Sequence, residues 1–433
     1  MRLGRSNVTA FFRSTTTTSA PTQGSAARSL RFYSSSSSSP SSAAAKKTLH
    51  FWLRAEQKPN EHRTLLLPEH VAQLLSAGHR VTVERSHMRC IPDEDYARLR
   101  QKGGTLLEMA EEGSWASKAP KEAVIIGLKE LPEEREDRPL VHRHVYFAHC
   151  YKGQRGSEQL LRRFHLGGGR LWDLEFLVDE QGKRVASFSH AAGKVGMGLG
   201  LLCWAYQRLG EGGAGVLPPQ LKPYESYDDL CAHARELVEA AAVKSGGERP
   251  SVLVMGAAGR SGTGAVTISK KVGVTPVEWD RKHTQGGGPF PQLLQHHIFA
   301  NCIYLDPTVR VPPFLTTDLL RNSAERRLSV IADVSCDTTN PNNPLPFSTE
   351  NTTFRKPTQR VIPAHSPDHA SPLPLDVLAI DHLPSLVPQE ASREFGDLMI
   401  GHLLAFDNTA VWHRAEKLFG EHLRKHGLTP SSA

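Results

Sequence analysis

The amino-acid sequence predicts an α/β protein built from two doubly wound parallel sheets. Segments typical of strands alternate with segments typical of helices, which is the pattern of parallel sheets covered by helices. The strand segments are short apolar runs, as expected for buried strands. At 433 residues the chain exceeds the roughly 250–300 residues at which one hydrophobic core generally stops growing. We therefore expect two such domains.

The alternation begins at residue 48. Residues 48–55 predict a strand, and residues 68–84 predict a helix, a glycine stop and a second strand. Two further strand-and-loop segments follow at 122–132 and 143–151. Residues 156–177 then predict a helix, a glycine turn and another strand. We expect these strands to lie parallel in one sheet.

A second α/β unit follows a long helix. Residues 191–210 predict a glycine-rich helix, and the polar, Pro- and Gly-rich residues after it predict a connection. Residues 249–273 then predict a strand, a glycine-rich turn and a helix. The remaining elements follow in order: strands at 275–280, 297–305 and 328–335, then amphipathic helices at 390–406 and 411–427.

The composition argues against several classes of function. The net charge of +7 arises in residues 1–47, which hold seven of the 52 Lys and Arg and no Asp or Glu. In the rest of the chain, 45 Lys and Arg are equal in number to the 45 Asp and Glu. A neutral body lacks the counterion-release drive of nucleic-acid binding. No apolar run approaches the roughly 18 residues of a membrane span. The six scattered cysteines favour a reducing compartment over a disulfide framework.

Residues 1–47 have the character of a targeting sequence. They are rich in Arg and Ser and contain no acid, which is typical of an organelle transit peptide. The string RFYSS at 31–35 resembles a mitochondrial processing site. We therefore predict a mitochondrial protein. The alternative is a cytoplasmic protein whose polar N-terminal tail is not a targeting signal.

A glycine-rich turn at residues 256–264 indicates a dinucleotide site. It follows an apolar strand and opens a helix, so its backbone can approach a pyrophosphate at the helix N-terminus. The spacing is G-x-x-G-x-x-G rather than G-x-G-x-x-G, and a turn without ligand is the alternative. Asp280 ends the next strand, where it can accept hydrogen bonds from ribose hydroxyls and repel a 2′-phosphate. Despite Arg281 and Lys282 beside it, we predict NAD rather than NADP.

Polar side chains gather at five strand ends of the first half. Ligands of open parallel sheets bind at the carboxyl ends of the strands. The residues concerned are Lys58, Glu61, Arg63, Lys129, Glu130, His149, Lys152, Gln154, Glu175 and Arg184. Any one of them alone is typical of a solvated loop, but their shared placement predicts an active site.

The histidine-rich residues 141–154 allow a metal site or an acid–base site. A metal would use His142 and His144 on one strand face with His149 or Cys150, but the segment offers no convincing fourth ligand, and we predict no metal. A strand that begins only after Arg143 would instead leave the first two histidines in solvent.

The acid–base interpretation pairs Lys129 with His149, at the ends of strands that can be neighbours. An imidazole titrates near neutrality without help. Desolvation and the nearby cations Arg63 and Lys152 would lower the pKa of the lysine.

Several strings together resemble the fungal saccharopine dehydrogenases, the NAD-dependent, L-lysine-forming type within the alanine dehydrogenase/transhydrogenase-like superfamily. The resemblance runs from about residue 48 to 425. The strings are LRAEQKP, IIGLKELPE, FAHCYKGQ, LWDLEFL, GAAGRSGTG, DVSCDTTNPNNP and IDHLPSLVPQEAS. It implies two Rossmann-like domains with an active-site cleft between them, at residues 48–187 and 188–391, with residues 392–433 returning to the first.

The resemblance also implies the reaction and its residues. Saccharopine, NAD and water would give lysine, 2-oxoglutarate and NADH, in the last step of the α-aminoadipate route to lysine. Lys129 would accept the amine proton, and His149 would manage protons during imine hydrolysis. The substrate contacts implied, besides Lys129, are Arg63, Gln154, Arg184, Phe188, Ser335, Cys336 and Asp337. Lys58, Glu61, Lys152 and Glu175 would tune the site. The cofactor contacts implied are Lys183, Gly259, Arg260, Asp280, Thr284, Tyr304, Val334, Ile380, Asp381, His382 and Leu383.

One stretch departs from the family. After Phe188 the chain has SHAAGKVG, where relatives tend to have aromatic residues. The expected partner is a small molecule, and we expect a monomer. Two other functions stay open: an alanine-dehydrogenase-like enzyme acting on a small 2-oxo acid, and a regulatory NAD-binding module without turnover.

Overall fold

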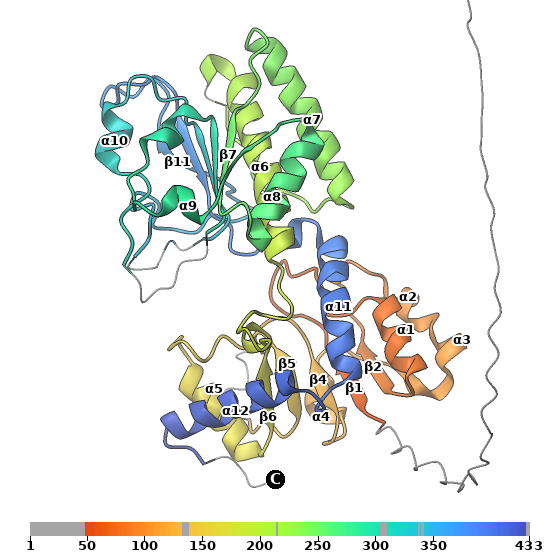
Figure 1. Ribbon diagram of the computed structural model, residues 1–433. Coiled ribbons are helices and arrows are strands. Elements are labelled where there is room, and N and C mark those ends of the chain that lie inside the picture. The colour runs from red at the N-terminus through yellow and green to blue at the C-terminus, as the bar shows by residue number, and fades with distance from the viewer. Residues whose placement is uncertain are drawn as a thin grey trace, which may run out of the picture. The chain divides into compact units, whose positions relative to one another are not determined.

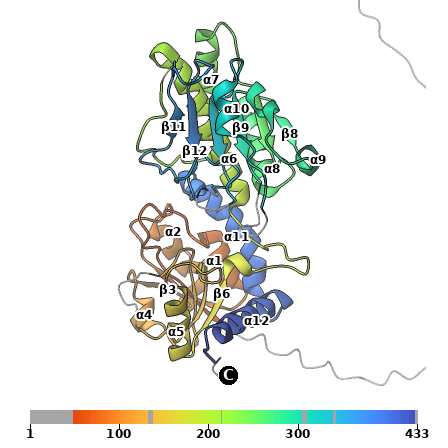
Figure 2. The same ribbon diagram turned by 90° about the vertical axis from the view of Figure 1, so that its left-hand side faces the viewer.

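The computed structural model describes residues 48–131, 138–213, 215–303, 310–336, 338 and 342–429 (Figures 1 and 2). The predicted targeting segment 1–47 lies outside the described residues. The described chain contains two largely parallel sheets with helices, as the sequence predicts; each has six strands, against the five and four strand segments that the sequence indicated. None of the described helices combines the length and apolar character that a membrane crossing requires.

The first sheet is entirely parallel, in the order β3-β2-β1-β4-β5-β6. Its strands are β1 (His50–Leu53), β2 (Arg80–Glu84), β3 (Leu107–Ala110), β4 (Val124–Ile126), β5 (Arg143–Tyr146) and β6 (Arg170–Asp173). The order reverses between β1 and β4, because β2 and β3 extend to one side and β5 and β6 to the other. Such a switch point is where open α/β sheets bind ligands.

Alternate residues of these strands fill two different cores. Phe51 and Leu53 point into one apolar cluster, whereas Trp52 between them points into the other together with Ile125. Most positions of these strands are therefore buried on both faces, as expected of a parallel sheet covered by helices.

Helices from both ends of the chain cover this sheet. They are α1 (Pro68–Ser76), α2 (Asp93–Ala97), α3 (Arg100–Gly103), α4 (Trp115–Lys118), α5 (Ser157–Gly167), α11 (Pro388–Leu404) and α12 (Ala410–Lys425), with 3₁₀ turns η1 (Gly104–Leu106) and η3 (Leu174–Phe176). Helix α11 lies against α1, and α12 lies against β6 (Figure 1). The indole nitrogen of Trp172 donates to the Trp412 carbonyl oxygen (3.2 Å), which joins strand and helix.

The second sheet has the order β11-β12-β10-β9-β7-β8. Its strands are β7 (Val252–Met255), β8 (Val277–Trp279), β9 (Ile298–Asn301), β10 (Val330–Asp333), β11 (Gln359–Ile362) and β12 (Leu375–Leu378). Five strands are parallel, and β11 is an antiparallel edge strand that the alternating pattern did not predict. Its Arg360 forms an ion pair with the buried Asp376 of β12 (2.8 Å), which anchors this edge.

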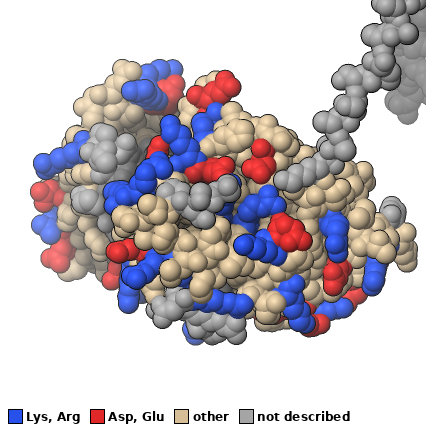
Figure 3. Space-filling model, turned by 90° about the horizontal axis from the view of Figure 1, so that it is seen from below, with Lys and Arg blue, Asp and Glu red and all other residues tan. Residues whose placement is uncertain are grey.

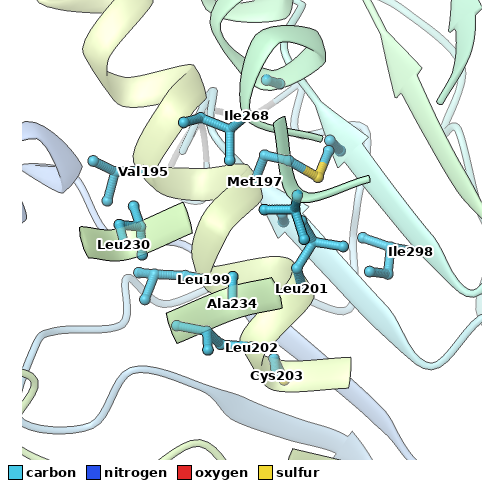
Figure 4. Close-up of a cluster of buried hydrophobic side chains, with 14 of the residues drawn as sticks. Val195, Met197, Leu199, Leu201, Leu202, Cys203, Leu230, Ala234, Ile268 and Ile298 are labelled. Carbon is cyan, nitrogen blue, oxygen red and sulfur yellow. The ribbon is translucent and has the colours of Figure 1, made fainter. Parts of the chain in front are cut away.

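The second sheet is also covered on both faces. Its helices are α6 (Ser189–Leu209), α7 (Tyr227–Lys244), α8 (Arg260–Val272), α9 (Arg281–Thr284) and α10 (Thr317–Asn322), with η4 (Glu211–Gly213), η5 (Pro291–Gln295) and η6 (Leu383–Leu386). Leucines and valines of α6 pack with α7, α8 and β9 in the core shown in Figure 4.

Glycines allow α6 to approach α8 closely. A Cβ atom at Gly193 would lie 1.8 Å from the carbonyl oxygen of Ser261, and one at Gly264 would lie 2.1 Å from that of His190. No side chain fits at either position without moving backbone. Backbone packing thus explains Gly193 of α6 and Gly264 of α8, whereas Gly196 and Gly198 of α6 lie against the side chains of Val334 and Leu230.

Both early histidines of the 141–154 segment are buried, which corrects the expectation that a strand starting at Arg143 would leave them in solvent. His144 is fully buried among the rings of Trp115, Tyr146 and Phe164. Neither of its ring nitrogens has a hydrogen-bond partner among the described residues. Burial holds its pKa well below the usual range, so the ring is neutral at pH 7.

We predict that His144 makes the stability of the protein fall in mild acid. Because the unfolded chain binds a proton near pH 6.5 and the buried ring does not, lowering the pH from 6.5 to 5 costs about 2 kcal/mol at this residue. His144→Phe should remove that part of the loss, measured as the thermal unfolding midpoint at pH 7.5 and pH 5. The exposed His413→Asn is the control and should follow the parent protein. An equal midpoint loss in His144→Phe would contradict the assignment.

Candidate active site

Lys129 lies at the switch point of the first sheet. It follows β4, which pairs in register with β1. Its backbone N–H donates to the buried carboxylate of Glu56 (2.9 Å), and its carbonyl oxygen accepts from Arg54. Sequence reasoning missed these two residues, although an Arg and a Glu two positions apart, at the end of an apolar strand, are an unusual pattern for a buried segment.

The surroundings of Lys129 lower the pKa of its amine. Burial is the largest cause, and the guanidinium of Arg63 is the second. Glu61 and Asp381 act in the opposite direction, and Lys58 adds a small further lowering. The direction of the shift and the part played by Arg63 agree with the prediction. A lysine in this state can exchange a proton closer to neutral pH.

Arg63 is held rigidly. Its guanidinium forms two hydrogen bonds to Glu61, from Nε (2.8 Å) and Nη2 (2.6 Å), and both side chains are buried. The guanidinium lies over the ring of Phe188 (4.3 Å), which stacks on Phe395 (4.3 Å between centroids). Ser385 donates to Glu61 (3.3 Å), which links this group to η6. Phe395 and Ser385 were not singled out from the sequence.

His149 pairs with a carboxylate. Its Nδ1 lies 2.6 Å from Oε1 of Glu130, and Nζ of Lys58 lies 3.3 Å from Oε2 of the same residue. The hydrogen bond to Glu130 is the largest cause that raises the pKa of His149. His149 has a φ of 49°, an uncommon value for a residue with a side chain, and its ring stacks on Phe147. Within the described ranges, no cluster of His, Cys, Asp and Glu has the form of a metal site.

Lys152 and Gln154 lie farther along the same loop. Lys152, the second cation expected to act on Lys129, forms an ion pair with Glu175 (2.7 Å). Gln154 accepts a hydrogen bond from the Lys152 N–H (2.8 Å). Gln154 also lines a surface hollow of about 780 Å³ with residues of α5, and neither Lys129 nor His149 lines that hollow.

The glycine turn lies at the switch point of the second sheet. A Cβ atom at Gly256 would lie 3.0 Å from the Cys302 carbonyl oxygen at the end of β9, and Gly256 also has a φ of 82°. A Cβ atom at Gly262 would lie 2.1 Å from the carbonyl oxygen of Gly256. Gly259 is less crowded, with one neighbouring atom at 3.1 Å, and gives α8 no side-chain cap. An anion can therefore reach the first N–H groups of α8, as a pyrophosphate requires.

Asp280 lies close to this turn. The N–H groups of Gly256 and Ala257 both donate to the Trp279 carbonyl oxygen (2.9 and 3.0 Å). Asp280 caps α9 and accepts hydrogen bonds from the Lys282 N–H (3.0 Å) and from His283 (2.9 Å). Against the opposing effect of desolvation, these contacts lower its pKa, so the carboxylate is ionised at neutral pH. Thr284 ends the same helix.

Arg260 connects the glycine turn to the first half of the chain. It donates to the carbonyl oxygen of Arg184 (2.5 Å) and to the hydroxyl of Ser187 (3.0 Å). The loop before them places Lys183 in a turn closed by Asp179, where its side chain is exposed. No contact among the described residues joins Lys183 to the glycine turn.

The remaining predicted residues follow β10 and β12. The N–H groups of Val334 and Ser335 donate to the Asn301 carbonyl oxygen (3.0 and 3.2 Å), beside the glycine turn, and Cys336 has a φ of 55°. The run Ile380, Asp381, His382 and Leu383 connects β12 to η6. Burial is the largest cause that lowers the pKa of His382, followed by Arg63, with Lys129 contributing. This run therefore lies within electrostatic reach of the lysine. Tyr304 and Asp337 lie outside the described residues.

These features define a class of protein. A glycine turn beside an ionised strand-end aspartate can hold NAD, and its partner sheet presents an amine of lowered pKa and a histidine–carboxylate pair. Together they form a dinucleotide-dependent oxidoreductase with its own acid–base groups.

Comparisons with known proteins identify the family. Residues 52–195 match the model of the alanine dehydrogenase/PNT N-terminal domain. The chain is 44% identical over 382 residues to saccharopine dehydrogenase [NAD(+), L-lysine-forming] of Schizosaccharomyces pombe, covering 87% of this chain and 99% of that protein. The enzyme of the same description from Emericella nidulans is 46% identical over 380 residues, covering 86% and 96%. The chain therefore belongs to the NAD-dependent, L-lysine-forming saccharopine dehydrogenases.

A solved structure supports the fold. An L-alanine dehydrogenase superposes with a TM-score of 0.58 over 86% of this chain and 93% of its own, at 16% sequence identity. At that identity the likeness extends to the α/β architecture alone.

We predict that Glu130→Gln lowers the pKa of His149. The amide keeps a hydrogen-bond acceptor but lacks the negative charge that stabilises the imidazolium, so the proton should leave at lower pH by about one unit or more. The ring's NMR titration measures this. Glu112→Gln serves as a control, because that carboxylate pairs with the exposed His87 instead. An unchanged His149 titration would show that Glu130 does not set its protonation.

Proposed function

We propose that this chain converts saccharopine, NAD⁺ and water into L-lysine, 2-oxoglutarate and NADH, using Lys129 and His149 as its acid–base groups. The observation that carries the assignment of roles is the lowered pKa of the Lys129 amine, in a chain that belongs to the saccharopine dehydrogenases. The partners that this reaction requires are small molecules: saccharopine and NAD⁺ as substrates, and lysine and 2-oxoglutarate as products.

The reaction requires a proton acceptor before hydride transfer. The secondary amine of saccharopine must be neutral before hydride can leave the adjacent carbon, and Lys129 in its neutral form accepts that proton. NAD⁺ held at the glycine turn would supply the hydride acceptor. His149, oriented by Glu130, then moves protons as water adds to the resulting imine and the carbinolamine collapses.

The substrate carries three carboxylates, which need cations and donors. Arg63 presents a planar, fixed guanidinium whose charge is partly balanced by Glu61. Arg184, Gln154, Phe188, Ser335 and Cys336 remain proposed contacts. On the cofactor side, the N-terminus of α8 would hold the pyrophosphate and Asp280 the ribose.

Two reactions and one binding measurement test the overall function. Purified protein mixed with saccharopine and NAD⁺ should produce NADH, followed by its absorbance at 340 nm. Alanine in place of saccharopine tests an alanine-dehydrogenase-like activity and should give no comparable rate. NAD binding without turnover on any of these substrates would instead support a regulatory module and contradict the proposal.

We predict that Lys129→Met slows turnover by about 100-fold or more, because positioned acid–base groups typically contribute 10²–10⁴-fold. NAD affinity should stay within about twofold, since removing the amine leaves the glycine turn unchanged. In the parent enzyme the rate of saccharopine oxidation should rise with pH through the lowered pKa of the lysine, because only the neutral amine accepts a proton. Unchanged turnover in Lys129→Met would remove the lysine from the mechanism.

We predict that Asp280→Ala weakens NAD binding more than saccharopine binding. The cap on α9 would also be lost, at a stability cost of about 0.5–2 kcal/mol. Asp280→Asn keeps a capping side chain but not the charge, so it separates the two effects. Titration calorimetry should show weakened NAD binding in both variants. Normal NAD affinity in the Asn variant would assign Asp280 to capping alone.

We further propose that residues 1–47 direct the protein to mitochondria and that the mature protein is a monomer with no nucleic-acid partner. The tail carries the whole excess of positive charge. On the face shown in Figure 3, Lys and Arg are interspersed with Asp and Glu, which does not favour a polyanion. The mass of the endogenous protein's N-terminal peptide tests the processing, and an intact Met1 would argue against it.

A further inference from the structure

Two residues that follow β1 hold the backbone of the segment that follows β4. Glu56 accepts hydrogen bonds from the N–H groups of Leu128 (2.6 Å, to Oε1) and Lys129 (2.9 Å, to Oε2). Nη2 of Arg54 donates to the Lys129 carbonyl oxygen. The amide and the carbonyl of the proposed proton acceptor are therefore both bound by side chains.

These two side chains also bind each other. Nη1 of Arg54 lies 3.4 Å from Oε2 of Glu56, and the side chains are only 2% and 5% exposed. The guanidinium lies 5.6 Å from the ring centre of Tyr146. A buried ion pair is weak evidence for stability, because desolvation opposes the attraction between the charges. Stability alone is therefore an incomplete reason for its presence.

Gly127 gives the guanidinium its path to Lys129. A Cβ atom at this position would lie 2.5 Å from Nε of Arg54 and 2.7 Å from Cζ. Any side chain here would push the guanidinium away from the Lys129 carbonyl. The chain thus combines a glycine, an arginine and a glutamate around one short segment.

Arg54 and Glu56 bind the loop that follows β4 rather than the strands of the sheet. Strands β1 and β4 already pair from Phe51 to Leu53, and the N–H of Arg54 donates to the Ile126 carbonyl oxygen (3.0 Å). Arg54 and Glu56 bind only beyond that point, where the chain has left the strand. The direction of the Lys129 side chain depends on this stretch of backbone.

We propose that Arg54 and Glu56 are positioning residues that hold Lys129 with its amine in a partly buried place within electrostatic reach of Arg63. This inference rests on the proposed role of Lys129 as the proton acceptor. In this proposal, Arg54 and Glu56 contact neither the substrate nor NAD. Both act through the backbone of the lysine, since a misplacement of about 1 Å costs about 100-fold in rate.

The test is the pH dependence of turnover in Glu56→Gln. Glutamine has one acceptor oxygen and an NH₂ group that cannot accept, so one of the two backbone N–H groups loses its partner. We expect kcat for saccharopine oxidation to fall about 10- to 100-fold, with KM for NAD changed less than about threefold. The rising limb of the rate profile should move to higher pH, because a released lysine is better hydrated and farther from Arg63.

Two further variants distinguish the proposed effect on Lys129 from a general loss of stability. Gly127→Ala displaces Arg54 without changing any charge and should give the same shift of the rising limb. Asp376→Asn breaks a buried ion pair with Arg360 at the edge of the second sheet. As the matched control, it should lower the unfolding temperature and leave the limb in place.

The outcomes separate this inference from the function it rests on. If Lys129→Met retains turnover, the role of the lysine fails. If Lys129→Met is inactive while Glu56→Gln and Gly127→Ala lose rate equally at every pH, the pair is structural and the positioning role is overturned. Failure of both of these variants to fold, with Asp376→Asn folded, would likewise make the pair structural only.

Discussion

The partly buried Lys129 amine, within electrostatic reach of the Arg63 guanidinium, is the constraint on which the site depends. Two cations that repel each other and lose hydration need compensation from carboxylates. Glu61 supplies it by binding the guanidinium through two hydrogen bonds. The guanidinium rather than the amine receives this close contact, so the fixed charge is balanced and the titratable group keeps a lowered pKa. This asymmetry makes the neutral form of Lys129 more accessible than that of an unperturbed lysine.

Both sheets place their functional segments where the strand order reverses. In the first sheet the loops after β1 and β4 meet at Lys129, and in the second the loops after β7 and β9 meet at Gly256. At a switch point, neighbouring loops turn to opposite faces and leave room that side chains and ligands can use. The first loop pair fills that room with charged side chains. The second keeps it open with glycines, which divides acid–base chemistry and dinucleotide binding between the sheets.

The predictable features were those encoded by local pattern. The strands, the long glycine-rich helix and the polar strand ends follow from periodicity and from turn residues. Partners between distant segments do not, because a sequence does not state which loops meet. The sequence shows Glu130 next to Lys129. Its contact with His149 could not be predicted from the sequence alone, because it depends on β4 and β5 being neighbours in the sheet. The antiparallel β11 is a short edge strand without a helix before it, so alternation gave no sign of it. Asp280 was predicted to bind the ribose. Its second role, as the N-cap of α9, could not be predicted because the sequence did not indicate that helix.

The stretch after Phe188 shows what holds the start of α6. His190 and Lys194 both pair with Glu394 of α11 (3.2 and 2.5 Å). Partly exposed ion pairs contribute only about 0–1 kcal/mol each, too little to position a helix alone. The backbone contact of Gly193 with α8 and the stack of Phe188 on Phe395 involve neither of these two charged side chains. The start of α6 is therefore held by packing rather than by these ion pairs, and Arg63 keeps the aromatic surface on which it lies.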